Sequence, residues 1–569
     1  MLKVKFLGAY EGITGSCSWL WHTDSDTQLL VDCGMHQGPH EEEWKNYKPF
    51  EFDARKIQYV LLTHAHIDHC GLLPKLVKNG FKGWVYCTQA TRDIAELMLR
   101  DAAKISDLFN ESDVNLIKWH VIDAGGFHWN KTLRLSDGLS VVYKRGSHVL
   151  GACGVSIMWS DKDREDGLKS IHFSGDIGSQ LEGNCYLPIM KDDHYPYPKS
   201  DYIVVESTYG ATERDSYFKN HENRINELGS IISNTVFENN GTVLIPAFSF
   251  HRTQELIFDM LAWQWKYWGE SKSKDLMGAL ITKEDESNVY ESPLRVLCDS
   301  PLGSKVNKVY GDQLLKRLAN GKYQYLNSEL AGRLNSDETE VARIFRDLDN
   351  NGSIYRNGHI VRCLRPEDRE KKKANQGINK TIEHYGVIIA SSGMCDHGPV
   401  VSYLKKMSRN PNNTIVLTGY QSQGSMGRYL IEKSEAASCN EAGANIVNMS
   451  GFYSAHGDQE KIVDYIFSLG TLGKDSRPAH VFINHGEATS KSCLQDAIRH
   501  RADQAKHGDR TVSSVEIAKS SWFDLSNGRY LEESNNRGDT LIDRLSSIED
   551  KLSRLTDELA NLQLERARR

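Results

Sequence analysis

The stretch "YVLLTHAHIDHCGLLPKLV" (Tyr59–Val77) crowds four ionisable residues into six positions: His64, His66, Asp68 and His69. An apolar run precedes them, so they stand at the end of what reads as a buried strand. Side chains at a strand end can point into one cavity, and imidazoles with a carboxylate suit Zn²⁺, with Mn²⁺ and Fe²⁺ as alternatives. We therefore predict a metal site in which His64 and His66 share one ion. Asp68 and His69, beyond the turn, are expected to reach a second ion.

Other predicted strands also end in ionisable residues. Short β-like runs alternate with glycine turns over the first 210 residues. Strand ends that share one edge of an α/β sandwich are where such folds build sites. The residues concerned are Asp32 in LLVDCG, His148 in RGSHVLGACG, Asp176 in HFSGDIG, Glu206 in VVESTYG and, near the far end of the chain, His485 in FINHGEAT. Two metals need more than the first four ligands, and His148, Asp176 and His485 are the candidates.

The pattern of predicted strands and helices changes near residue 210 and again near residue 450. From about Ser216, longer helix-like stretches alternate with the strands GTVLIPAF, YGVIIASSG and NTIVLTGYQSQG. The strand-and-loop style of the first region then returns with NIVNMSGFYSAHGD. This pattern predicts a second α/β region between two stretches of the first type.

Length and composition set the class of protein. At 569 residues the chain exceeds one ordinary core, so two or three domains are expected. It is 39% hydrophobic, has no apolar run long enough to span a membrane, and begins without the apolar core of a signal peptide. We expect a soluble cytoplasmic protein, and 11 scattered cysteines without a CxxC pair agree with this. The net charge of −7 argues against an indiscriminate nucleic-acid coat, although local cations and bound metals can still serve a nuclease.

A heptad pattern marks the end of the chain. Apolar residues recur alternately four and three positions apart at Leu541, Leu545, Ile548, Leu552, Leu555, Leu559 and Leu562. Such a seam is typical of a coiled coil, although an amphipathic helix folded back on the body has a similar pattern. We predict a C-terminal helix over residues 538–569 and a homo-oligomer contact through residues 541–562.

Seven motifs within residues 1–530 carry a resemblance to a known family. HAHIDH is similar to the HxHxDH signature of the metallo-β-lactamase superfamily, with Asp32 upstream and with His148 and Asp176 downstream. More narrowly, the chain resembles the β-CASP nucleases, the branch that includes the pre-mRNA 3′-end-processing endonuclease and ribonuclease J. Three residues match the additional motifs of that branch: Glu206, His456 in FYSAHGD, and His485 in INHGE.

The resemblance implies an α/β fold: an αββα metallo-β-lactamase sandwich with an inserted α/β β-CASP domain. The first part of the sandwich is expected over residues 1–208 and the β-CASP domain over 209–445. The chain is then expected to return to the sandwich over residues 446–530, before the heptad helix.

The resemblance also implies how two Zn²⁺ ions, with Mn²⁺ as the alternative, would be held. His64, His66 and His148 would hold one ion. Asp68, His69 and His485 would hold the other. Asp176 would bridge the pair, and Asp32 would orient the ligands or the bridging hydroxide.

The activity implied is that of a zinc-dependent hydrolase, a ribonuclease acting as an endonuclease, a 5′–3′ exonuclease or both. Two ions about 3.5–4 Å apart can activate a hydroxide and clamp phosphate oxygens during in-line displacement. His456, oriented by Glu206, is expected to protonate the leaving 3′-oxygen as the general acid. Asp32 and Asp68 complete the set of expected catalytic residues.

The expected substrate is single-stranded RNA. By resemblance, a histidine at the position of His485 goes with RNA-processing members of the branch, whereas DNA-repair members carry a valine there. The inserted domain would cap the metal edge and form a narrow cleft that favours single strands. His251 and Arg252, in FSFHRTQE, are candidates to contact backbone phosphates.

Two other functions compete with this hypothesis. A hydrolase of small thioesters or lactones would explain the metals but would leave Glu206, His456 and the insertion of more than 200 residues without a role. A non-catalytic scaffold subunit of an RNA-processing complex is disfavoured, because such relatives have lost ligands and this chain keeps every one.

Overall fold

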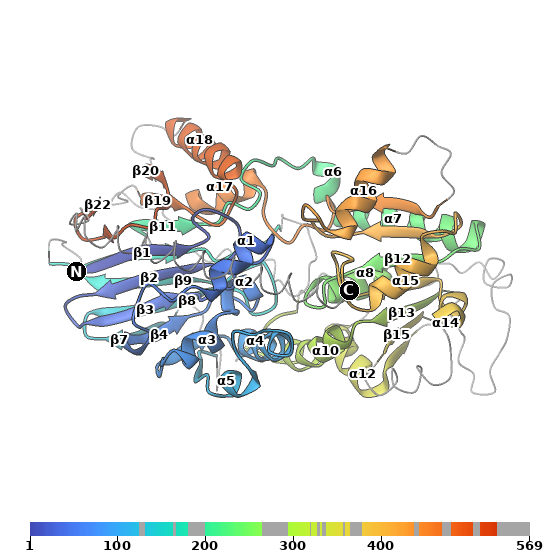
Figure 1. The fold of residues 1–569 in the computed structure, drawn as a ribbon, viewed down its shortest axis with the longest axis horizontal. Helices are drawn as coiled ribbons and strands as arrows, with labels where there is room; N and C mark the ends of the chain where they lie inside the picture. The colour runs from blue at the N-terminus through green and yellow to red at the C-terminus, as the bar shows by residue number, and fades with distance from the viewer. Residues whose placement is uncertain are drawn as a thin grey trace, which may run out of the picture.

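The structure is a computed structural model that describes residues 1–123, 131–162, 167–179, 200–264, 294–318, 320–326, 331–332, 337–356, 359–364, 378–436, 443–468, 479–504 and 512–531. Two bodies lie side by side in it (Figure 1). One contains the N-terminal part of the chain together with the segments after residue 458, and the other contains most of the chain between them. The predicted helix over residues 538–569 lies outside the described residues, so that helix and its oligomer contact stay predictions.

The first sheet has eight strands in the order β22-β21-β1-β2-β3-β4-β5-β6. They are β1 (Leu2–Gly8), β2 (Cys17–His22), β3 (Thr27–Val31), β4 (Ile57–Leu61), β5 (Trp84–Cys87), β6 (Trp119–Val121), β21 (Phe523–Asp524) and β22 (Arg529–Tyr530). Strand β1 shows that one face of this sheet points into the core. Its residues alternate between buried and partly buried along LKVKFLG. Strands β3 to β6 run parallel.

The second sheet has seven strands in the order β20-β19-β11-β10-β9-β8-β7. They are β7 (Thr132–Ser136), β8 (Leu139–Arg145), β9 (Cys153–Ser160), β10 (Leu168–Phe173), β11 (Tyr202–Val205), β19 (Ala479–Ile483) and β20 (Val512–Ile517). Strand β19 pairs in parallel with β11, although more than 270 residues separate them. The chain therefore returns to its first domain after a long insertion.

These two sheets pack face to face with helices outside. One apolar cluster fills the space between them and includes Phe6, Val155 and Phe482. Four helices lie at the outer face of the first sheet, and two cover that of the second. The first set is α2 (Ile67–Cys70), α3 (Leu73–Lys78), α4 (Gln89–Ala102) and α5 (Glu111–Asn115), and the second is α17 (Gln459–Ser468) and α18 (Ala488–Gln504). This is the predicted αββα sandwich.

The third sheet belongs to the other body and has the order β14-β15-β13-β16-β12-β17-β18. Its strands are β12 (Val243–Pro246), β13 (Arg295–Asp299), β14 (Ser353–Arg356), β15 (His359–Cys363), β16 (Val387–Ala390), β17 (Thr414–Leu417) and β18 (Asn445–Asn448). All neighbours are parallel except β14 and β15. Four-residue runs such as VLIP and VIIA are buried throughout, as strands covered on both faces must be.

Helices cover both faces of this third sheet. One face packs against α7 (His221–Ile232), α8 (Arg252–Gln264), α10 (Pro301–Leu314) and α12 (Glu338–Asn351). The opposite face packs against α14 (Ile378–His384), α15 (Pro399–Met407) and α16 (Met426–Ala436). The apolar cluster on the first of these faces continues into the outer helices of the sandwich. At this contact, Gln313 of α10 donates a 3.2 Å hydrogen bond to Asp93 of α4. The two bodies therefore share a packed core at this contact (Figure 1).

The predicted end of the insertion at residue 445 falls at the first residue of β18. Residues 445–448 pair with β17 of the third sheet, so this sheet extends beyond the predicted bound. The NIVN run resembles the strands of the sandwich in composition, and its sequence alone does not say which sheet it joins. Within the described part of the chain, no helix is long and apolar enough to cross a bilayer.

Candidate metal centre

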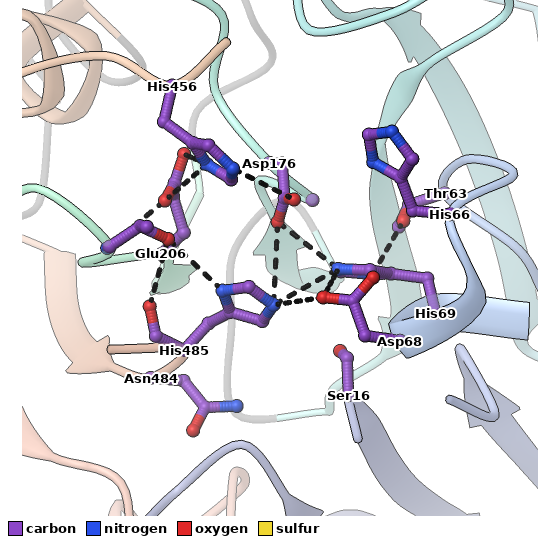
Figure 2. Close-up of polar contacts among 12 residues, drawn as sticks. Ser16, Thr63, His66, Asp68, His69, Asp176, Glu206, His456, Asn484 and His485 are labelled. Atoms are coloured by element: carbon purple, nitrogen blue, oxygen red, sulfur yellow. Dashed lines mark hydrogen bonds and ion pairs between the residues drawn. The ribbon is translucent and has the colours of Figure 1, made fainter. Parts of the chain in front are cut away.

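Strand ends gather the predicted site residues at one edge of the sandwich (Figure 2). Parallel strands bring their carboxyl ends to the same edge, which explains why residues far apart in the chain meet. Asp32 follows β3, the segment from His64 to His69 follows β4, His148 follows β8, Asp176 follows β10, Glu206 follows β11 and His485 follows β19. The chain turns sharply at two of these positions, because Asp32 and His485 both have positive φ, at 61° and 52°.

Three histidines form the first group of candidate ligands. His66 Nδ1 lies 3.1 Å from the Nε2 atoms of both His64 and His148. Asp176 faces this group with Oδ2, which is 3.5 Å from Nε2 of His64 and of His148. One ligand atom from each of the four residues lies within 4.8 Å of the others, so the set can hold one ion.

The second group faces the other oxygen of the same carboxylate. Nε2 of His69 lies 3.1 Å from Nε2 of His485, and Asp68 Oδ2 lies 3.6 Å from the latter. Asp176 Oδ1 is 3.3 Å from His69 Nε2 and 3.8 Å from that of His485. Asp176 thus stands between the two groups with one oxygen toward each. Figure 2 shows its side toward His69 and His485.

The donor set fits metal ions better than it fits hydrogen bonding alone. His148 Nδ1 donates to the carbonyl of Ala455 at 3.0 Å, so a neutral His148 presents a bare Nε2 to the group. Asp176 Oδ1 is buried and makes no well-formed hydrogen bond, although His69 Nε2 lies 3.3 Å away. Buried acceptors that converge in this way are costly unless a cation lies among them.

Burial keeps the first group in the state that metal binding requires. It lowers the pKa of His66 to about 4, against the opposing pull of Asp68 and Asp176. Burial also lowers the pKa values of His64 and His148 well below the usual range. These three imidazoles are therefore neutral at physiological pH, as metal ligands must be.

His69 behaves differently because carboxylates surround it. Burial alone would lower its pKa, but Asp176, Asp32 and Asp68 together raise that pKa well above the ordinary value. Its Nδ1 donates to Asp32 Oδ2 at 2.7 Å, which turns Nε2 toward the centre. A metal ion at Nε2 would displace the second proton, so binding at this group should release a proton.

The remaining hydrogen bonds hold the ligands in place. Asp32 accepts from the backbone N–H of Thr63 at 2.8 Å and from its hydroxyl at 2.9 Å. Thr63 Oγ1 also lies 3.1 Å from Nδ1 of His64, and Thr208 Oγ1 lies 3.3 Å from Nδ1 of His485. Partners of this kind fix the orientation of metal-binding imidazoles. Asp32 thus joins Thr63 to His69 through hydrogen bonds, and its orienting role stays a prediction.

A buried carboxylate and a histidine stand beside the two groups. Nδ1 of His456 lies 3.1 and 3.2 Å from the oxygens of Glu206, which also accept from the backbone N–H groups of Ile177 and Thr208. Nε2 of His456 points to the centre and lies 3.9 Å from Asp176 Oδ2 (Figure 2). Burial opposes its charge, but the Glu206 and Asp176 carboxylates outweigh burial and raise the pKa of His456 to about 9. His456 is therefore protonated at neutral pH.

Comparison with known proteins agrees with this geometry. The family described as Metallo-beta-lactamase superfamily matches residues 11–141, and the Beta-Casp domain matches residues 276–430. The chain belongs to the β-CASP branch of the metallo-β-lactamase superfamily.

Curated relatives span most of this β-CASP chain. Ribonuclease TTHA0252 of Thermus thermophilus is 27% identical over 470 residues, which cover 82% of this chain and 90% of that protein. Transcription termination factor FttA of Methanocaldococcus jannaschii is 24% identical over 518 residues (88% and 69%). Cleavage and polyadenylation specificity factor 73 of Drosophila melanogaster is 26% identical over 509 residues (88% and 62%).

His251 and Arg252 have a different setting in this β-CASP protein from the one predicted. Both are buried at the start of α8, which is buried along its whole length. Arg252 donates to the Glu255 carboxylate and to the carbonyl of Tyr453, and His251 lies 3.3 Å from the Tyr310 hydroxyl. Side chains enclosed in this way are not presented to a nucleic acid, so these two residues do not offer the phosphate contacts predicted for them.

The same network anchors the segment that carries His456. The Tyr453 hydroxyl donates to Asp259 of α8 at 2.7 Å, and Arg224 of α7 donates to Asp259 at 2.8 Å. Tyr453 is three residues before His456, so the β-CASP helices fix the base of that loop. The sequence gives no local signal for this role, because the partners lie about 200 residues apart.

Proposed function

We propose that this chain is a metal-dependent ribonuclease that hydrolyses phosphodiester bonds of single-stranded RNA. One observation supports this most: the two groups of ligands that share Asp176 have the Glu206–His456 pair beside them. A ribonuclease and an RNA-processing factor are among the named relatives. A small-ester hydrolase would have no use for a proton donor of this kind or for the inserted domain.

The ligands would divide as the geometry divides them. His64, His66 and His148 would hold one ion, and Asp68, His69 and His485 would hold the other, with Asp176 between them. Zn²⁺ suits this donor set, and Mn²⁺ is the alternative. Two such ions supply an activated water and neutralise phosphate oxygens during in-line displacement.

His456 would supply the proton that the leaving 3′-oxygen needs. Glu206 accepts from Nδ1 and stabilises the charged imidazolium, so the proton available for transfer is the one on Nε2. Nε2 faces the centre, and the side chain keeps 19% of its surface accessible. The donor is therefore both held in place and reachable by a substrate.

A time course on RNA tests the ribonuclease proposal and its mode of action. We expect single-stranded RNA labelled at either end to be cut, and a chelator to stop the reaction. A circular RNA of the same sequence separates the modes, because only an endonuclease can cut it. Intact RNA in every metal condition, with metal bound to the protein, would contradict the proposal.

Changing Glu206 should alter the pH dependence of cleavage. The acid form of His456 is present below its pKa and is lost as the pH rises through about 9. Glu206→Gln removes the nearest carboxylate, so the alkaline limb of the pH–rate profile should move down by about 1–3 pH units. The matched control is Glu516→Gln, which removes the carboxylate 3.5 Å from His480, away from the centre. A limb that stays in place in Glu206→Gln would refute the orienting role.

A further inference from the structure

The loop after β12 connects the β-CASP sheet to the metal centre. Phe250 is buried, and its ring meets the ring of His66 edge-on at 5.1 Å. Two residues earlier, Phe248 leaves 40% of its surface exposed. A large aromatic ring is therefore open to solvent within two residues of a contact with a candidate ligand.

Phe248 also lies where the helices that follow neighbouring strands of the third sheet change from one face of the sheet to the other. Helix α8 follows β12 on one face, whereas α15 and α16 follow the neighbouring strands β16 and β17 on the other face. Doubly wound sheets bind ligands in the crevice at the carboxyl ends of strands that diverge in this way. The loop of β12 that carries Phe248 starts in this crevice.

Two glycines of the neighbouring loops make room for the ring. A Cβ atom added to Gly393, after β16, would lie 2.9 Å from Phe248 Cδ2. One added to Gly419, after β17, would lie 3.4 Å from Cε2. The ring thus rests on backbone, which holds it in place while leaving part of its surface open.

Tyr420 lies next to this ring in the chain fold. It follows Gly419, whose added Cβ atom would face Phe248 Cε2, and it leaves 52% of its surface exposed. Phe248 and Tyr420 are therefore two exposed aromatic residues on adjacent loops at the carboxyl edge of the third sheet, and Phe248 lies two residues from the contact between Phe250 and His66.

We propose that Phe248 and Tyr420 form a stacking ledge for a nucleobase of single-stranded RNA next to the bond that is cut. This inference rests on the ribonuclease proposal and specifies how its substrate is held. Unpaired bases present open faces that stack on aromatic side chains, whereas bases in a duplex are already stacked on each other. Phe248 lies two residues from the contact between Phe250 and the candidate ligand His66, which favours a base of the substrate over a separate partner protein.

The test combines ring-removing variants with RNAs that lack one base. A series of oligoribonucleotides carries a single abasic ribose at successive positions around the cleaved bond. On intact RNA, Phe248→Ala and Phe248→Leu should each slow single-turnover cleavage about tenfold, whereas Phe248→Tyr should act like the wild type. At one position beside the bond, the abasic RNA should slow the wild type equally and should not slow Phe248→Ala further. Tyr420→Ala should show the same pattern at that position or its neighbour.

Trp84→Ala is the matched control. Trp84 is 47% exposed, but it lies at the amino end of β5, opposite the edge that carries the centre. This variant should cleave every RNA at the wild-type rate. The ledge would be overturned if every abasic RNA slowed Phe248→Ala as much as it slows the wild type, or if the Phe248 and Tyr420 variants cleaved at the wild-type rate. A protein would then be the remaining candidate to bind these rings.

Binding separates failure of the ledge from failure of the ribonuclease proposal. If the wild type cuts no RNA, the ribonuclease proposal fails, and anisotropy of the same labelled oligonucleotides then decides the ledge. Weaker binding of one abasic RNA to the wild type, with no further weakening in Phe248→Ala, would support it. Equal binding of all oligonucleotides would overturn it.

Discussion

His456→Ala should slow RNA cleavage by about 10²–10⁴-fold while both metal ions stay bound. The side chain donates to Glu206 through Nδ1 and turns Nε2 to the centre, and neither group of ligands includes it. The variant would remove the proposed proton donor for the leaving 3′-oxygen without removing a proposed ligand. Single-turnover kinetics together with metal analysis of the same sample would measure both effects.

The leaving group offers a sharper version of this experiment. A substrate with sulfur in place of the leaving 3′-oxygen needs no acid, because a thiol is far more acidic than an alcohol. His456→Ala should therefore cut the sulfur substrate at nearly the wild-type rate. His500→Ala, on the outer helix α18, is the matched control and should leave both substrates unaffected. An equal loss on both substrates would assign His456 a role other than proton donation.

Asp176→Asn should have the other large effect. One oxygen of Asp176 faces each ligand group, so the amide removes an anionic donor from both ions at once. We expect the bound metal to fall below two ions per chain. Cleavage should fall by more than the roughly 10²–10³-fold that loss of a single electrostatic contact costs.

Asp524→Asn is the control for loss of a buried carboxylate. Asp524 is buried in β21 and accepts hydrogen bonds from its own turn, on the edge of the first sheet. This variant should keep its metal and its activity. Two tightly bound ions and wild-type cleavage in Asp176→Asn would contradict the bridging assignment.

Local sequence predicted the elements of the centre well, because strand ends are marked by abrupt changes from apolar to ionisable residues. The run from Tyr59 to Leu62 predicts β4, and the ligands His64 to His69 must follow it. The division of these ligands into two groups came from the family resemblance together with the sequence, and the structure brings the residues together in those groups.

Contacts between distant segments could not be read from the sequence. Ala455 accepts from His148 through a backbone carbonyl, which every residue possesses, so no residue type marks this role. Arg252 is a cation in a polar segment and suggests a phosphate contact, yet packing of α8 against the Tyr453 loop turns it inward. The strand at 445–448 joins the third sheet because of its pairing with β17, which its four residues do not encode alone.

Reconstitution of the metal-free protein tests the central claim most directly. Zn²⁺ or Mn²⁺ is added stepwise, the ions bound per chain are counted by mass spectrometry, and the single-turnover rate on single-stranded RNA is measured on the same samples. The two ligand groups joined by Asp176 predict that the rate rises until two ions are bound and then stays constant. Full cleavage by the metal-free protein, or a rate that is complete with one ion and unchanged by the second, would contradict a two-metal ribonuclease.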